Sequence, residues 1–133
     1  MPVRTRIGLA VSLLMALATP LLAQTSSTKG SSPAVTPAFV TRGDSVYHGP
    51  GNCYACHGTK GEGLVGPNLT DAEWIHSKGT YEEIVTQIKD GVPKEKSKSG
   101  IPMPPKGGST ISDEDVKAVA AYVLSLSQKQ SGS

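Results

Sequence analysis

The chain has only two cysteines, Cys53 and Cys56, which lie three residues apart, and His57 directly follows the second. Four kinds of chemistry use thiols and an imidazole at this spacing: a disulfide, a redox dithiol, a zinc site and covalent attachment of haem. A disulfide here would close a very small loop and restrict the unfolded chain little. A redox dithiol of this spacing belongs in a βαβ unit, and the sequence has no such pattern.

Zinc and haem differ in what they require around His57. A closed zinc site needs four ligands, and the fourth would have to come from His48 or His76, at no usual spacing. The consecutive order C-x-x-C-H is the signature of c-type haem attachment, in which two thiols bond to the vinyl groups of the haem. The motif therefore predicts one haem, covalently bound through Cys53 and Cys56, with His57 as an axial ligand of the iron.

A second axial ligand is expected on the opposite face of the iron, and a methionine there raises the reduction potential. Met1 and Met15 lie in the N-terminal segment 1–23, so the sequence points to Met103, in "SGIPMPPKGG". Prolines on both sides stiffen this loop by fixing φ. His48 and His76 are the competing ligands. We expect both on the surface, and ligation through His76 stays open as the alternative.

Residues 1–23 have the composition of a secretory signal peptide, because Arg4 and Arg6 precede an apolar run that ends at Ala23. An uncleaved membrane anchor is the alternative, although a bilayer-spanning helix needs about 20 apolar residues. Either way, we expect a periplasmic location. Cleavage would lower Lys+Arg from 13 to 11, equal to Asp+Glu, so the charge balance does not support nucleic-acid binding.

Composition divides the remainder of the chain into three parts. Residues 24–38 are rich in Ser, Thr and Pro and predict a flexible linker. Residues 39–128 predict one folded domain, and 129–133 a flexible tail. A domain of this size often needs a metal, a disulfide or a cofactor to complete its core.

The folded part has the pattern of short helices joined by glycine- and proline-rich loops, without alternating strands. Helical spacing predicts a first helix over 39–47, although Gly43 inside it costs about 1 kcal/mol against alanine. Capping boxes at 70–73 and 80–83 predict a short helical turn through residue 75 and a longer helix that Gly91 ends.

The last helix has the strongest signals, because Ser112 caps it and three acidic residues follow in its first turn. Apolar side chains cover a wide arc of this helix, which predicts burial against two neighbouring elements. Four residues fill the opposite side of the helix: Lys117, Ala118, Ala121 and Ser125.

With these motifs, the sequence resembles the class I (monohaem) cytochromes c over nearly all of residues 39–126. The resemblance rests on the C-x-x-C-H motif, on "GPNL" at 66–69, on "IPMPP" around Met103 and on "VAAYVLSL" in the last helix. It implies an all-α fold with three to five short helices around one covalently bound haem c. "DAEWIHSKG" is similar to small bacterial single-haem domains associated with oxidases and dehydrogenases.

The resemblance also implies roles for single residues. The carbonyl of Pro67 would accept a hydrogen bond from His57, and Tyr122 would pack against Gly43 of the first helix. The stretch from Tyr47 to the first cysteine is slightly longer than is usual in the family, which affects the expected first loop at the haem edge but not the fold.

The expected function is electron transfer in the periplasm, with the iron cycling between Fe(II) and Fe(III) under His57/Met103 ligation. We do not expect an enzyme. The expected partners are redox proteins, namely a membrane oxidase, a reductase or a dehydrogenase, and the chain would be a monomer or a complex subunit. Membrane contact is expected only if the N-terminal segment stays uncleaved.

Two alternatives stay open: a haem c subunit or anchored domain of an oxidase or dehydrogenase complex, and a haem sensor with an open sixth coordination site. A surface for acidic partners is expected near the loop at 90–100. Five lysines (Lys89, Lys94, Lys96, Lys98 and Lys106) against Asp90 and Glu95 give a local excess of +3. The alternative is a solvated loop whose lysines only aid solubility.

Overall fold

The computed structural model describes residues 35–130 of the chain. The predicted signal peptide at 1–23 lies outside these residues, and so does most of the predicted linker at 24–38. The described part contains four α-helices and one 3₁₀ turn: α1 (Pro37–His48), α2 (Tyr54–His57), α3 (Tyr81–Asp90), η1 (Pro105–Gly108) and α4 (Asp113–Gln130).

No β-strand occurs among residues 35–130, where Val92 and Met103 form an isolated β-bridge. The structure thus has the all-α architecture that the sequence predicts, with a number of helices inside the expected range. No helix within the same residues has the length and apolar character needed to cross a membrane.

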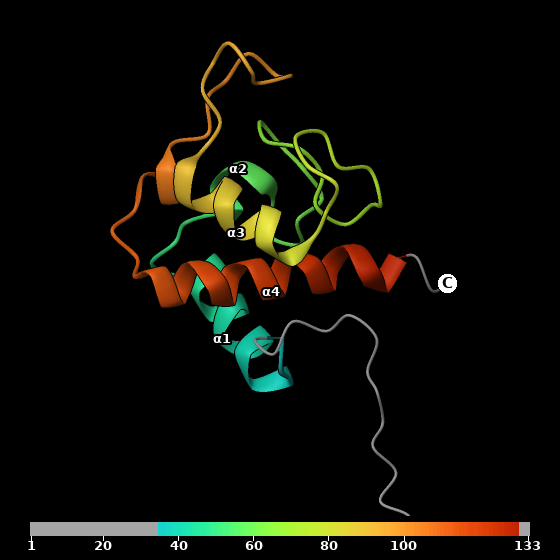
Figure 1. The fold of residues 1–133 in the computed structure, drawn as a ribbon, viewed down its shortest axis with the longest axis vertical. Coiled ribbons are helices and arrows are strands. Elements are labelled where there is room, and N and C mark those ends of the chain that lie inside the picture. The colour runs from blue at the N-terminus through green and yellow to red at the C-terminus, as the bar shows by residue number, and fades with distance from the viewer. Residues whose placement is uncertain (1–34, 131–133) are drawn as a thin grey trace, which may run out of the picture.

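Helices α1 and α4 cross in contact, and α3 packs on another side of α4 (Figure 1). The crossing depends on Gly43, because a methyl group at this position would collide with the carbonyl oxygen of Ala118 and lie 2.8 Å from Cβ of Tyr122. The expected contact between Tyr122 and Gly43 is therefore present, and it explains a glycine inside a helix.

Burial of α4 is wider than the sequence predicts. Val116 and Val119 are almost fully buried in a core that includes residues of α1 and α3, as expected for a helix with two neighbours. Ala118 and Ala121, which we expected opposite the apolar arc, are also fully buried. For Ala118 the reason is the close approach of α1, because Gly43 lies directly against its backbone.

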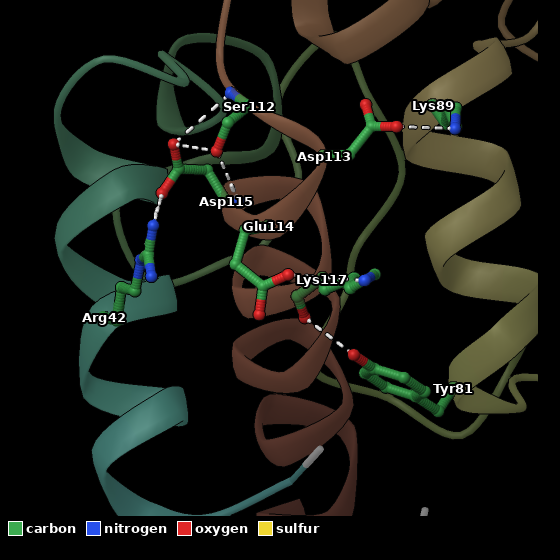
Figure 2. A network of polar contacts seen from close by, with 8 residues as sticks. All are labelled: Arg42, Tyr81, Lys89, Ser112, Asp113, Glu114, Asp115 and Lys117. Atoms are coloured by element: carbon green, nitrogen blue, oxygen red, sulfur yellow. Dashed lines mark hydrogen bonds and ion pairs between the residues drawn. The ribbon is translucent and has the colours of Figure 1, made fainter.

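The helix ends follow from local hydrogen bonds. Ser112 Oγ accepts from the Asp115 N–H at 3.1 Å, and Asp115 Oδ2 accepts from Ser112 Oγ at 2.7 Å. Asp115 also accepts from Arg42 of α1, which ties the start of α4 to its neighbour (Figure 2). Helix α3 begins at a complete capping box formed by Thr80 and Glu83.

One predicted helical turn is missing, and two helix ends differ from the prediction. The expected helical turn over 70–75 is absent, since Asn68 Oδ1 accepts from the Thr70 N–H at 2.8 Å and Asp71 Oδ1 from the Glu73 N–H at 3.1 Å. Such local bonds stabilise bends in competition with helix. Helix α1 begins inside the predicted linker and α4 extends into the predicted tail.

Candidate haem site

Helix α2 is a single turn that carries the C-x-x-C-H motif. Cys53 directly precedes this turn and is half-buried, whereas Cys56 is exposed. Residues three apart on a helical turn lie on one face, and both cysteines line one cleft together with His57. Burial raises the pKa of the Cys53 thiol to about 11, so the free thiol is protonated at neutral pH.

The imidazole of His57 is held in one orientation. Its Nδ1 lies 2.9 Å from the carbonyl oxygen of Pro67, the contact that the family resemblance implies. A carbonyl can only accept, so Nδ1 carries the hydrogen and Nε2 keeps a lone pair that can bind a metal. Burial lowers the pKa of His57, against the opposing effect of the Pro67 bond, and so favours this neutral ring.

Gly66 makes room for this orientation. A methyl group at position 66 would lie 2.9 Å from Cε1 and 3.0 Å from Nδ1 of His57. The Gly66 N–H donates to the carbonyl of Cys56 at 2.9 Å, so the loop is also fastened to the end of α2. The glycine therefore lets the next carbonyl, that of Pro67, reach the ring.

Met103 is fixed through its backbone. Its N–H donates to the carbonyl of Val92 at 2.9 Å, and the Val92 N–H donates to the carbonyl of Met103 at 2.8 Å. Gly91, which ends α3 with φ of 72°, allows this approach, because a side chain there would collide with the Met103 carbonyl. The end of α3 thus holds the loop that carries the predicted distal ligand.

Two adjoining hollows form the cleft, and Cys53, His57 and Met103 line both. The inner hollow has mostly apolar walls: Tyr47, Leu69, Trp74, Ile84, Ile88, Val119 and Val123. An imidazole nitrogen, a thioether sulfur, two thiols and apolar walls are the groups that a covalently attached haem requires. The residues present therefore fit the predicted cofactor.

The two competing histidines occupy different places. His76 is exposed, as expected, but it lines the outer hollow together with His57 and Met103. His48 is only partly exposed and does not line either hollow, because its ring nitrogens contact Asp44 and the carbonyl of Thr59. The geometry therefore leaves His76 as a competitor of Met103 for the iron. The contacts of His48 were not predicted from the sequence.

The expected basic surface is weaker than the sequence suggests. Lys89 and Lys106 both pair with Asp113, at 2.7 and 2.8 Å. Counting the five lysines against Asp90, Glu95 and Asp113 leaves a local excess of +2, not +3. Lys98 lines the outer hollow, so one basic side chain of this loop lies at the site itself.

Comparison with known proteins identifies the family of the domain. A family model described as cytochrome C oxidase, cbb3-type, subunit III matches residues 38–123. The chain belongs to this family. The cbb3-type cytochrome c oxidase subunit CcoP of Rubrivivax gelatinosus is 38% identical over 109 residues, 81% of this chain and 33% of that protein. The corresponding subunit FixP of Sinorhizobium medicae is 36% identical over 104 residues, 76% of this chain and 35% of that protein.

The chain spans about a third of the length of these oxidase subunits. A shorter relative, cytochrome c-554(548) of Halomonas halodenitrificans, is 38% identical over 78 residues, 56% of this chain and 84% of that protein. The crystal structure of cytochrome CL from Methylophaga aminisulfidivorans matches with a TM-score of 0.56 at 19% identity, covering 78% of this chain and 72% of that chain. The fold is a cytochrome c fold, and the cofactor of this family is a covalently bound haem c.

Proposed function

We propose that the domain is a periplasmic electron-transfer module in which Cys53 and Cys56 hold one haem c, with His57 and Met103 as axial ligands. The observation that carries the proposal is that these four side chains line one cleft, although Met103 comes from a distant loop. The bound haem supplies one-electron chemistry between Fe(II) and Fe(III). On this proposal the domain transfers electrons between proteins and is not itself an enzyme.

The surrounding residues would set the properties of the site. The Pro67 carbonyl fixes the tautomer of His57 and increases the basicity of its Nε2, as carbonyl partners do at metal-binding histidines. With the haem bound, the apolar walls of the inner hollow would exclude water. The β-bridge to Val92 fixes the backbone of Met103 beside the cleft, so that the thioether needs little ordering to bind.

Covalent attachment is tested by mass and by extraction. The intact mass of protein exported with a haem-maturation system should equal the mature chain plus one haem, and acid–organic solvent should leave the haem on the protein. Cys53→Ala and Cys56→Ala should each retain at most one thioether. Free extraction of haem from the wild type would refute the proposal.

The distal ligand is tested by spectroscopy of Met103→Ala beside the control His76→Ala. We expect the oxidised wild type and the His76 variant to show the weak near-infrared band of sulfur–iron ligation. Met103→Ala should lose this band, lower the reduction potential and bind cyanide or carbon monoxide readily. A sulfur–iron band that persists in Met103→Ala would refute Met103 as the ligand. A bis-histidine spectrum of the wild type that only His76→Ala abolishes would assign the position to His76.

The oxidase subunits among the relatives support a membrane oxidase as the partner, and a free shuttle is the alternative. The mouth of the cleft offers a contact surface, because Val65 and Ile101 line it and are 48% and 50% exposed. Affinity purification from detergent-solubilised membranes distinguishes the two. A subunit should co-purify with an oxidase in fixed ratio at high salt, whereas a shuttle should be recovered alone from the periplasmic fraction.

A further inference from the structure

Two adjacent side chains at the end of α1 reach the segment that leaves α2. Tyr47, which is fully buried, donates from Oη to the carbonyl of Gly58 at 2.8 Å. His48 Nε2 lies 2.7 Å from the carbonyl oxygen of Thr59. Gly58 and Thr59 directly follow His57, so these two bonds fasten the backbone beside the proposed iron ligand to the helical framework.

The His48 bond has a proton requirement that the Tyr47 bond lacks. On the other side of the ring, His48 Nδ1 lies 2.8 Å from Asp44 Oδ1 and 3.0 Å from the carbonyl oxygen of Asp44. Carbonyl and carboxylate oxygens can only accept, and a neutral imidazole has a single N–H. Both sides of the ring are therefore satisfied together only when His48 is a doubly protonated imidazolium.

The groups around the ring come from each element packed against it. Asp44 and Tyr47 lie on α1, Tyr54 on α2 and Tyr122 on α4, with ring centroids 5.0, 6.2 and 6.0 Å from that of His48. The segment after α2 contributes the Thr59 carbonyl, followed by Lys60 and Glu62.

Of these groups, Asp44 supplies the charge that acts on the ring. Burial, and then Asp44, raise the pKa of Tyr122 to about 12, and burial also raises that of Tyr47, so both phenols stay neutral at physiological pH. The bonds to Thr59 and Asp44 raise the pKa of His48. Because the His48 side chain is 33% exposed, protons from solvent can reach it.

We propose that His48 is a proton-dependent positioning residue, which fastens the segment behind the haem-bearing turn when protonated and places a positive charge beside that turn. This inference rests on the proposed attachment of haem at Cys53 and Cys56. A nearby positive charge favours the reduced iron, which carries one positive charge fewer. When an electron arrives from a redox partner or an electrode, His48 therefore holds its proton more tightly and draws it from solvent.

The test is the reduction potential of the haem-loaded protein, followed by optical titration from about pH 5 to 9, the range in which histidines titrate. The wild-type potential should fall as pH rises through the pKa of His48. His48→Gln keeps an amide donor for Thr59 but cannot titrate, so its profile should be flat across that step. Tyr47→Phe removes the neighbouring bond at a wall of the inner hollow, so the whole potential can shift, but the pH-dependent step should remain.

A wild-type profile without this step would overturn the proposal, and so would the same step in His48→Gln or its loss in Tyr47→Phe. If His48→Gln does not fold, Asp44→Asn is measured instead. Removal of the carboxylate should move the pH-dependent fall of the reduction potential to lower pH, and an unchanged position of that fall would refute the role of His48. Intact mass is measured for every sample. Failure of haem attachment, which would contradict the proposed function, then appears as missing mass and not as a flat profile.

Discussion

The crossing of α1 and α4 and the two loops that line the cleft are held in place by different interactions. At the crossing, Tyr47 packs against Tyr122 and Gly43 lies against Ala118, and both Tyr47 and Ala118 are fully buried. In the loops, Leu64, Val65 and Ile101 are between 48% and 68% exposed, and backbone hydrogen bonds and glycines fix the chain. We infer that apolar packing suffices for the helical framework, whereas the loops need the haem to complete their burial.

The largest effect is expected at the crossing, in Gly43→Ala. The new methyl group would collide with the backbone of α4, so the free energy of unfolding should fall by about 3 kcal/mol, at the upper end for overpacking. Gly100→Ala is the control in a loop, where a Cβ has no atom within 4 Å and the cost of a positive φ is about 1 kcal/mol. Denaturant titration measures both, and equal losses would contradict the contrast between the two regions.

A smaller effect is expected inside a loop, in Gly66→Ala. The added methyl group would press on the His57 ring, so the ring or the Pro67 carbonyl must shift, at about 1–2 kcal/mol. We expect a changed reduction potential with unchanged helix content by circular dichroism. An unchanged potential would show that the loop accommodates the methyl group without moving the imidazole.

Acid should act on the electrostatic link between α3, η1 and α4. Hydrogen bonds from Lys106 and then Lys89 lower the pKa of Asp113 to about 2. Because this pKa is below the value of about 3.9 for an unfolded aspartate, the stabilisation is complete above pH 4 and is lost as pH falls towards 2. Asp113→Asn should remove this part of the acid dependence in pH-resolved melting, and Glu114→Gln, whose carboxylate pairs within α4 with Lys117, serves as the control.

The smallest effect is expected from Lys94, Lys96 and Lys98, which are exposed and should contribute little to stability. Changing all three to glutamate should leave the unfolding midpoint nearly unchanged but slow electron transfer to an acidic redox protein at low salt. The difference should shrink above roughly 0.1 M salt, where the Debye length is about 10 Å. Equal rates at low salt would identify these lysines as solvated residues without a docking role.

Local signals in the sequence predicted much of the fold and of the candidate site. The C-x-x-C-H order identified Cys53, Cys56 and His57, which the structure places on the single turn α2, and capping residues identified α3 and α4. The bend over 70–75 was missed because a capping box and an aspartate turn share the same residue types, and only the competing side-chain bonds distinguish them.

Other features arise only when distant parts of the chain meet. Burial of Ala118 depends on a glycine in another helix, and the bonds of His48 depend on a carbonyl eleven residues away, which no local pattern encodes. The pairing of Lys89 and Lys106 with Asp113 likewise lowers the local excess of positive charge that a count along the loop gives.

The bridge between Val92 and Met103 fixes the backbone of Met103, so its position does not depend on the length of the segment between these two residues. Residues 93–102 form a loop whose two ends are joined by the pair of backbone hydrogen bonds between Val92 and Met103. Doubling the length of such a loop costs only about 0.6 kcal/mol in closure entropy. This loop can therefore accept an insertion, such as a peptide tag or a binding sequence, next to the redox site while Met103 keeps its position.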